Sequence, residues 1–155
     1  MNIGHAPLAV YDGVKRGIYD RGTVRDLPTD KPLRMGAYGD PASVPIEAWD
    51  GVTTRKVWTG YTHQWKQPFA APFKDLLMAS CDSVAEAAEA AQQGWRSFLV
   101  QSVGHQPPKQ LDTIECPAVG PKEVQCKDCG LCKGAAAPNA PSIFIPAHGS
   151  AKAFV

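Results

Sequence analysis

Four of the five cysteines lie close together in the last third of the sequence, and this cluster constrains the fold more than any other feature. The spacing is C-x9-C-x2-C-x2-C, from Cys116 through Cys126 and Cys129 to Cys132. Two residues between cysteines let their sulfurs approach one ion or one cluster from a tight turn. The first residues do not read as a secretion signal, so we expect a cytoplasmic protein, in which such a cluster indicates metal binding before disulfides.

The identity of the metal follows less directly from the spacing. Four thiolates satisfy tetrahedral Zn²⁺, and they equally satisfy the four corners of a [4Fe–4S] cluster. We favour zinc, because Cys126-x-x-Cys129-Gly130 resembles the turn of a zinc knuckle and nothing else in the chain demands redox chemistry. Since protein ligands would fill all four positions, the sequence predicts a structural role for the metal.

Size and composition predict one soluble domain over residues 1–155, with the metal-binding segment at 116–134 inside it. The chain is 44% hydrophobic and 20% charged, which is ordinary for a globular protein. Its net charge of +1 offers no broad field for nucleic acid or anionic lipid. No apolar stretch approaches the roughly 20 residues that span a bilayer, so we expect no membrane partner.

Short apolar runs alternate with helical patterns along the chain, which predicts an α/β fold with a mainly parallel sheet. The two architectures that fit are a partial (β/α) barrel and an open, flavodoxin-like sheet, each with a four-cysteine loop near the C-terminus. Five strands are too few for a closed eight-stranded barrel. Strands are predicted at 33–38, 57–61, 76–80, 97–100 and 142–145, helices at 7–16, 43–50 and 83–93, and a helical turn at 72–76.

The helix at 83–93 has the clearest local signals. Ser83-x-x-Glu86 is a capping box, in which the serine oxygen and the glutamate carboxylate each accept a free backbone N–H. Alanine and glutamate fill most of the following positions, and Gly94 stands where helices commonly end. We therefore expect this helix to cross over between two parallel strands.

Polar side chains follow the predicted strands. Because the carboxyl ends of parallel strands meet at one edge, these side chains are expected to line a shared ligand-binding face. Helix capping explains the two aspartates equally well. The residues are Asp40, His63, Gln64, Asp82 and His148.

Cys81, the fifth cysteine, stands before a predicted helix, where a lowered thiol pKa would make it a nucleophile. A buried, unreactive cysteine is the commoner outcome, and we favour it here.

Several strings resemble a family of phage and plasmid proteins of unknown function, over most of the chain. The matching strings are Ile18-Tyr19, Gly36-Ala37-Tyr38-Gly39-Asp40-Pro41, Thr59-Gly60-Tyr61-Thr62-His63-Gln64-Trp65, Met78-Ala79-Ser80, Asp82-Ser83, Gly94-Trp95-Arg96, Cys116-Pro117, the last three cysteines and His148-Gly149. A more remote resemblance is to the phage family named for gene product eighty-eight. It implies a partial barrel reminiscent of radical-SAM enzymes, although the Cys-x3-Cys-x2-Cys motif of those enzymes is absent near the N-terminus.

Three hypotheses of function follow. The leading one is a metal-binding phage or mobile-element protein that binds a small ligand or a partner at the carboxyl ends of its strands. The second is an enzyme in which His63 works with Asp40 or Asp82 as acid–base groups. The third, which we rank last because of the weak net charge, is a nucleic-acid accessory protein whose bases would stack on aromatic rings. Those rings are Trp58, Tyr61, Trp65 and Trp95.

Overall fold

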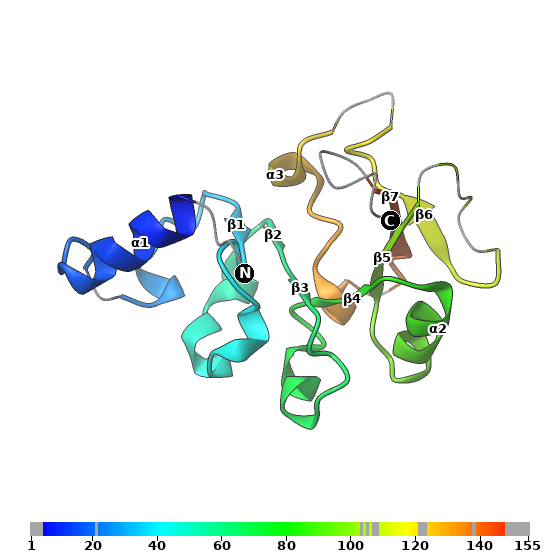
Figure 1. The fold of residues 1–155 in the computed structure, drawn as a ribbon, viewed down its shortest axis with the longest axis horizontal. Helices are drawn as coiled ribbons and strands as arrows, with labels where there is room; N and C mark the ends of the chain where they lie inside the picture. Colours follow the sequence, from blue (N-terminus) through cyan, green and yellow to red (C-terminus); the bar gives the residue numbers. More distant parts are fainter. Residues whose placement is uncertain are drawn as a thin grey trace.

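The structure is a computed structural model that describes residues 5–20, 22–102, 104, 106, 109–120, 124–137 and 139–147. Helix α1 lies at one end of the molecule, away from the main sheet (Figure 1). The helices are α1 (His5–Lys15), α2 (Val84–Gln92) and α3 (Cys126–Cys129). The strands are β1 (Leu33–Arg34), β2 (Trp58–Thr59), β3 (Tyr61–Thr62), β4 (Met78–Cys81), β5 (Ser97–Gln101), β6 (Thr113–Glu115) and β7 (Ser142–Pro146).

The strands form two sheets in which every observed pairing is parallel. The larger sheet has the order β3-β4-β5-β7-β6, and β1 pairs with β2 in a smaller one. The chain passes from the smaller sheet to the larger through Gly60, whose carbonyl accepts the backbone N–H of Met78. The predicted α/β class with an open, mainly parallel sheet is confirmed, and the described strands close no barrel.

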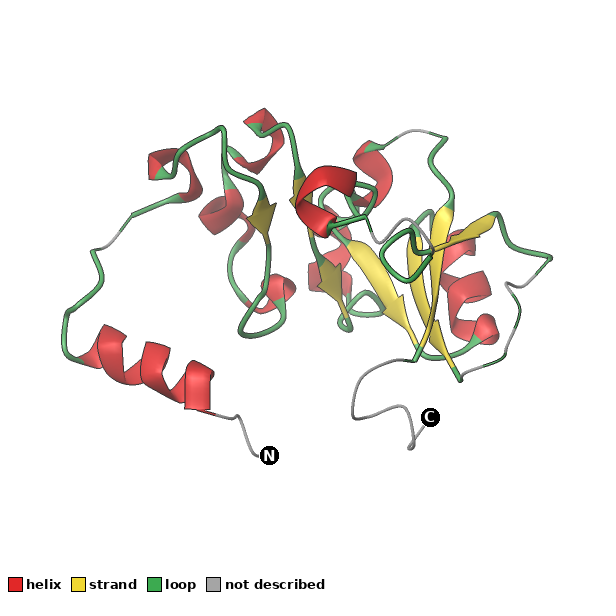
Figure 2. Cartoon of the chain, turned by 90° about the horizontal axis from the view of Figure 1, so that it is seen from above, coloured by secondary structure: helices red, strands yellow, loops and turns green. Residues whose placement is uncertain are grey.

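Helix α2 is the predicted crossover between β4 and β5, and it packs against both strands (Figure 2). The Ser83 hydroxyl oxygen accepts the N–H of Glu86 at 3.1 Å. The Glu86 carboxylate accepts the N–H of Asp82 at 3.0 Å, one residue before the serine. Gly94, with φ of +78°, then turns the chain toward β5. The local signals thus set both ends of this helix.

The two faces of the larger sheet have different covers. Ala79, Leu99 and Phe144 face the main core, together with residues of α2. Their neighbours Met78, Phe98, Ile143 and Ile145 point to the opposite face, because successive side chains along a strand alternate. A parallel sheet normally buries both faces under helices. Here the second face packs against Cys116, Leu131 and Cys132 of the cysteine segment.

The N-terminal half differs most from the sequence predictions. The predicted helix at 43–50 is instead two 3-10 turns, Pro41–Ser43 and Ile46–Trp49. Pro45 separates the two turns, since proline has no N–H for a continuous helical ladder. The predicted strand at 33–38 stops after Arg34, and Gly36 follows with φ of +71°.

Other boundaries moved less. The strand predicted at 57–61 is divided at Gly60 into β2 and β3, and the one predicted at 76–80 is found at Met78–Cys81. The helical turn predicted at 72–76 is a 3-10 helix at Pro68–Phe73. Strand β6 was not predicted, because its three residues, Thr113–Glu115, carry no strong apolar pattern.

Gly134 holds the cysteine segment against the loop before β4. Its φ is +66°, and a Cβ there would lie 2.6 Å from the carbonyl oxygen of Lys74 and 2.7 Å from the backbone nitrogen of Leu77. Those atoms are backbone, so they cannot swing aside. The close approach therefore requires glycine.

We expect Gly134→Ala to lower the free energy of unfolding by about 3 kcal/mol, from the positive φ and the clash together. The matched control is Gly17→Ala, because Gly17 has φ of +68° and nothing within 4 Å of the added Cβ. The loss of stability in Gly17→Ala therefore measures the cost of placing alanine at a positive φ, without any steric clash. Equal losses for the two variants in chemical denaturation would contradict the close packing at Gly134.

Candidate metal and ligand site

Cys116 is placed by the main sheet. It follows β6 directly, and its backbone N–H donates to the carbonyl oxygen of Phe144 in β7 at 2.8 Å. The hydrogen-bonded pairing of β6 with β7 therefore extends one residue beyond β6, to Cys116. Its side chain is buried, and this burial raises the pKa of the Cys116 thiol.

Cys132 is placed by the junction between the two sheets. Its carbonyl oxygen accepts the N–H of Gly60 at 3.2 Å. Burial raises the pKa of the Cys132 thiol to about 11, while a hydrogen bond from the Tyr61 hydroxyl favours the thiolate and lowers it. Tyr61 is thus the neighbour that can stabilise negative charge on this sulfur.

Cys126 and Cys129 occupy the two ends of the single turn of helix α3. Gly130 ends that turn in the left-handed conformation, with φ of +63°, and its N–H donates to the carbonyl oxygen of Cys126. The chain can then return toward the sheet at Cys132. Cys126 is exposed and Cys129 half-buried, so this pair is more accessible than Cys116 and Cys132.

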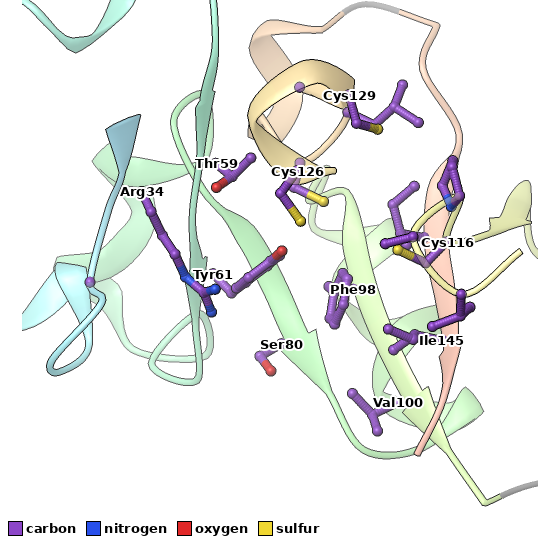
Figure 3. A pocket seen from close by; sticks show the side chains of 18 of the residues that line it. Arg34, Thr59, Tyr61, Ser80, Phe98, Val100, Cys116, Cys126, Cys129 and Ile145 are labelled. Atoms are coloured by element: carbon purple, nitrogen blue, oxygen red, sulfur yellow. The ribbon is translucent and has the colours of Figure 1, made fainter. Parts of the chain in front are cut away.

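All four cysteines line one cavity of about 970 Å³ (Figure 3). Within the described part of the chain, no three His, Cys, Asp or Glu side chains are close enough together to hold a single ion. The four thiols therefore face a common space without converging on one point. The neighbouring thiols Cys116, Cys126 and Cys129 also raise the pKa of Cys132, an effect that a bound cation would reverse.

The residue types match a metal site, although no three of the described side chains are close enough together to hold one ion. The thiols surround a common space, and four thiolates complete either a zinc site or a cubane cluster. Cys116, Cys126, Cys129 and Cys132 would be the ligands, and the metal would join the edge of the sheet to α3. The predicted metal site nevertheless stays a prediction.

Two of the predicted strand-end residues, Asp40 and His63, reach the same cavity. The Asp40 carboxylate accepts the Thr62 hydroxyl at 2.8 Å, the N–H of Ala42 at 2.9 Å and the N–H of His63 at 2.8 Å. These bonds cap the turn after Gly39 and tie it to the end of β3. Asp40 thus has the capping role that the sequence allowed.

The remaining strand-end residues lie elsewhere. Gln64 donates its side-chain N–H to the Ser43 hydroxyl at 3.0 Å and does not line the cavity. Asp82 is exposed beside the start of α2 and does not line it either. His148 lies outside the described residues. The structure therefore brings Asp40 and His63 to the cavity and leaves Gln64 and Asp82 outside it.

Several cavity residues were not predicted as a site. Phe98, Val100, Ile143 and Ile145 form its apolar wall, and Arg34 stands at its edge. The apolar wall could have been predicted from the sequence. The runs that form β5 and β7 are apolar at successive positions, which predicts strands that are buried on both faces. Nothing in the sequence marks Arg34 as a cavity residue, because a single basic residue in a short strand is common.

Cys81 and the tryptophans are structural. Cys81 is fully buried, and burial raises the pKa of its thiol to about 12, which suits an inert core cysteine. Trp58, Trp65 and Trp95 are buried in the main core. Their rings are unavailable for stacking on bases, so the nucleic-acid hypothesis loses most of the residues on which it rested.

Comparison with known proteins found no match to a family model, to a curated protein or to a solved structure. In the part of the chain that the structure describes, no helix has the length and apolar character needed to cross a membrane. The fold and the cavity are therefore the observations from which function has to be argued.

Proposed function

We propose that this protein binds a metal through Cys116, Cys126, Cys129 and Cys132, beside a cavity that accepts a small ligand. The observation that carries the proposal is that four thiols, one just after β6 and three from the α3 segment, line one cavity. Cys81, the fifth cysteine, is in the core on the other face of the sheet.

Either metal requires movement of α3 toward the sheet. Cys116 and Cys132 are hydrogen-bonded to Phe144 and Gly60 through their backbones, so we place the movement at α3. Zinc needs the four sulfurs about 2.3 Å from one ion, so it demands the larger movement. A [4Fe–4S] cluster spreads its four corners apart and demands less. The resemblance of the turn at Cys126–Gly130 to a zinc knuckle still favours zinc.

The setting that fits this site is a reducing one. Thiolate ligands persist in the cytoplasm, where disulfides are disfavoured. The motif resemblance supports a phage or plasmid origin, which would place the protein in the cytoplasm of the host cell. Both statements are parts of the proposal.

The enzymatic alternative has one supporting contact. The Nε2 atom of His63 lies 3.1 Å from the Ser80 hydroxyl, and both side chains line the cavity. Histidine beside serine can activate a hydroxyl when a third group orients the ring. Asp40 bonds to the backbone of His63 and not to its ring. We therefore rank metal and ligand binding above catalysis.

Metal analysis of protein purified without oxygen tests the proposal. We expect about one zinc ion per chain without visible colour, or about four iron atoms per chain with broad visible absorption. Cys81→Ala is the matched control and should keep the same metal, because that thiol does not line the cavity. Protein that stays free of both metals after reduction and supplementation would refute the proposed metal site.

A further inference from the structure

We propose that the cavity binds an organic anion with an apolar body, its charged group on Arg34 and its body against the sheet. This inference rests on the ligand cavity of the proposed function and not on the metal. It comes from three features of the described residues: an apolar wall, a cation without a partner, and the distribution of charge around the cavity.

The apolar wall belongs to the face of the larger sheet that also packs against the cysteine segment. Phe98 and Val100 from β5 line the cavity beside Ile143 and Ile145 from β7. Phe98 and Val100 are only half-buried, although they belong to central strands of a parallel sheet. Such a face normally packs against a helix. A ligand with an apolar body would bury the part of Phe98 and Val100 that the described residues leave exposed, and it would gain free energy from the buried area.

The cation at the edge is Arg34, on β1. Its side chain is exposed and lines the cavity, and its guanidinium makes no hydrogen bond or ion pair with another described residue. The other two arginines near strands differ, since Arg55 and Arg96 are buried and each donates to several backbone carbonyls. Among the described residues, therefore, none occupies the five N–H donors of Arg34, and they can serve a ligand.

The charge around the cavity favours an anion at that end. Among the described lining residues Asp40 supplies the one carboxylate, and its oxygens already accept three hydrogen bonds. Figure 3 shows Arg34 and Ser80 on one side of the cavity and Cys116 and Cys129 on the other. Arg34 supplies the one Lys or Arg side chain among the described lining residues. The anionic group should therefore lie on Arg34, with the apolar body toward the sheet.

A carboxylate and a phosphate both suit a guanidinium, which binds either with two parallel hydrogen bonds. The probes are four eight-carbon compounds, octanoate, octyl phosphate, 1-octanol and octylamine, titrated calorimetrically into the reduced protein. We expect either anion to bind about tenfold or more tightly than the alcohol and the amine. The tighter of the two anions identifies the charged group.

The matched variants are Arg34→Gln and Arg16→Gln, since Arg16 is exposed and does not line the cavity. Arg34→Gln should weaken binding of the better anion about tenfold or more, and Arg16→Gln should leave it unchanged. Equal binding of octanoate and octylamine by the parent, or unchanged anion binding by Arg34→Gln, would overturn the inference.

Metal content measured on the same samples separates the two proposals. Metal-containing protein that binds neither anion contradicts the ligand inference alone. Metal-free protein that binds an anion through Arg34 supports the ligand inference and contradicts the metal site. Circular dichroism confirms that Arg34→Gln is folded, which we expect because the side chain is exposed.

Discussion

Cys129→Ser is expected to remove most of the bound metal and the stability that the metal provides. A ligand that binds the native state stabilises it by about 4 kcal/mol when its concentration is a thousandfold above Kd. Serine is a poor metal ligand at neutral pH, and loss of a partner that merely orients a ligand already weakens metal binding by about 10- to 100-fold. Metal content and thermal unfolding, each with and without a chelator, measure the effect.

The control for that experiment is Cys81→Ala. It removes a thiol of the core and should cost some packing energy, but it should keep the metal and the sensitivity to chelator. Cys129 is only half-buried, so its serine variant has little packing to lose. If chelator lowers the melting temperature of Cys129→Ser as much as that of the parent, Cys129 is not a ligand.

The second large effect is expected from Arg96→Ala, with a loss of about 4 kcal/mol in the free energy of unfolding. The Arg96 side chain is 8% exposed, and it donates to the carbonyl oxygens of Leu131 at 2.9 Å, Gly134 at 3.0 Å and Pro141 at 2.6 Å. Hydrogen bonds from a charged donor contribute about 1.5–3 kcal/mol each, and buried carbonyls left without a donor cost more than exposed ones. Chemical denaturation measures the loss.

Arg96 also bears on the proposed metal site, because it donates to the backbone carbonyls of Leu131 and Gly134, on either side of Cys132. We expect Arg96→Ala to lower metal affinity even where the protein remains folded. Arg25→Ala is the control, since Arg25 is exposed and pairs with Asp50 on the surface. Surface pairs of this kind contribute little. A loss of stability in Arg96→Ala no greater than in Arg25→Ala would mean that the carbonyl contacts do not hold the segment.

The parts of the fold that could be predicted are those with complete local signals. Ser83, Glu86 and Gly94 mark both ends of α2 by hydrogen bonding and backbone conformation within a few residues. The strands at 97–100 and 142–145 are short apolar runs, and both lie inside the sheet rather than at its edge. Local chemistry decides such elements, so the sequence alone suffices.

The elements of the N-terminal half are determined by contacts between residues far apart in the sequence, which local sequence patterns do not reveal. The predicted strand at 57–61 is divided because β2 pairs with β1 and β3 pairs with β4, in different sheets. A Cβ at Gly60, between them, would lie 2.5 Å from the Leu77 side chain, which the fold brings close. The region at 43–50 has helix-forming residues, but Pro45 and the close packing at Pro41 and Ala42 leave it as 3-10 turns. β6 is visible only through its pairing with β7.

The candidate site was predictable in its cysteines and less so in its surroundings. Cysteine spacing keeps the sulfurs of Cys126, Cys129 and Cys132 near one another, whereas Cys116 reaches the same cavity through the pairing of β6 with β7. A place at the end of a strand, in contrast, determines where a residue's backbone lies but not whether its side chain points into the cavity. Asp82 follows β4 yet stays on the surface, while Arg34 lines the cavity from a two-residue strand. Which side chains turn inward depends on packing across the two sheets.

X-ray absorption spectroscopy at the metal edge is the most direct test of the four-cysteine centre. For zinc, we predict four sulfur neighbours at about 2.3 Å and no nitrogen or oxygen in the first shell. For iron, we predict sulfur-only neighbours together with a metal–metal shell from the cluster. In Cys129→Ser, an oxygen should replace a sulfur, or the metal should be lost. A first shell rich in nitrogen or oxygen in the parent protein would contradict the account.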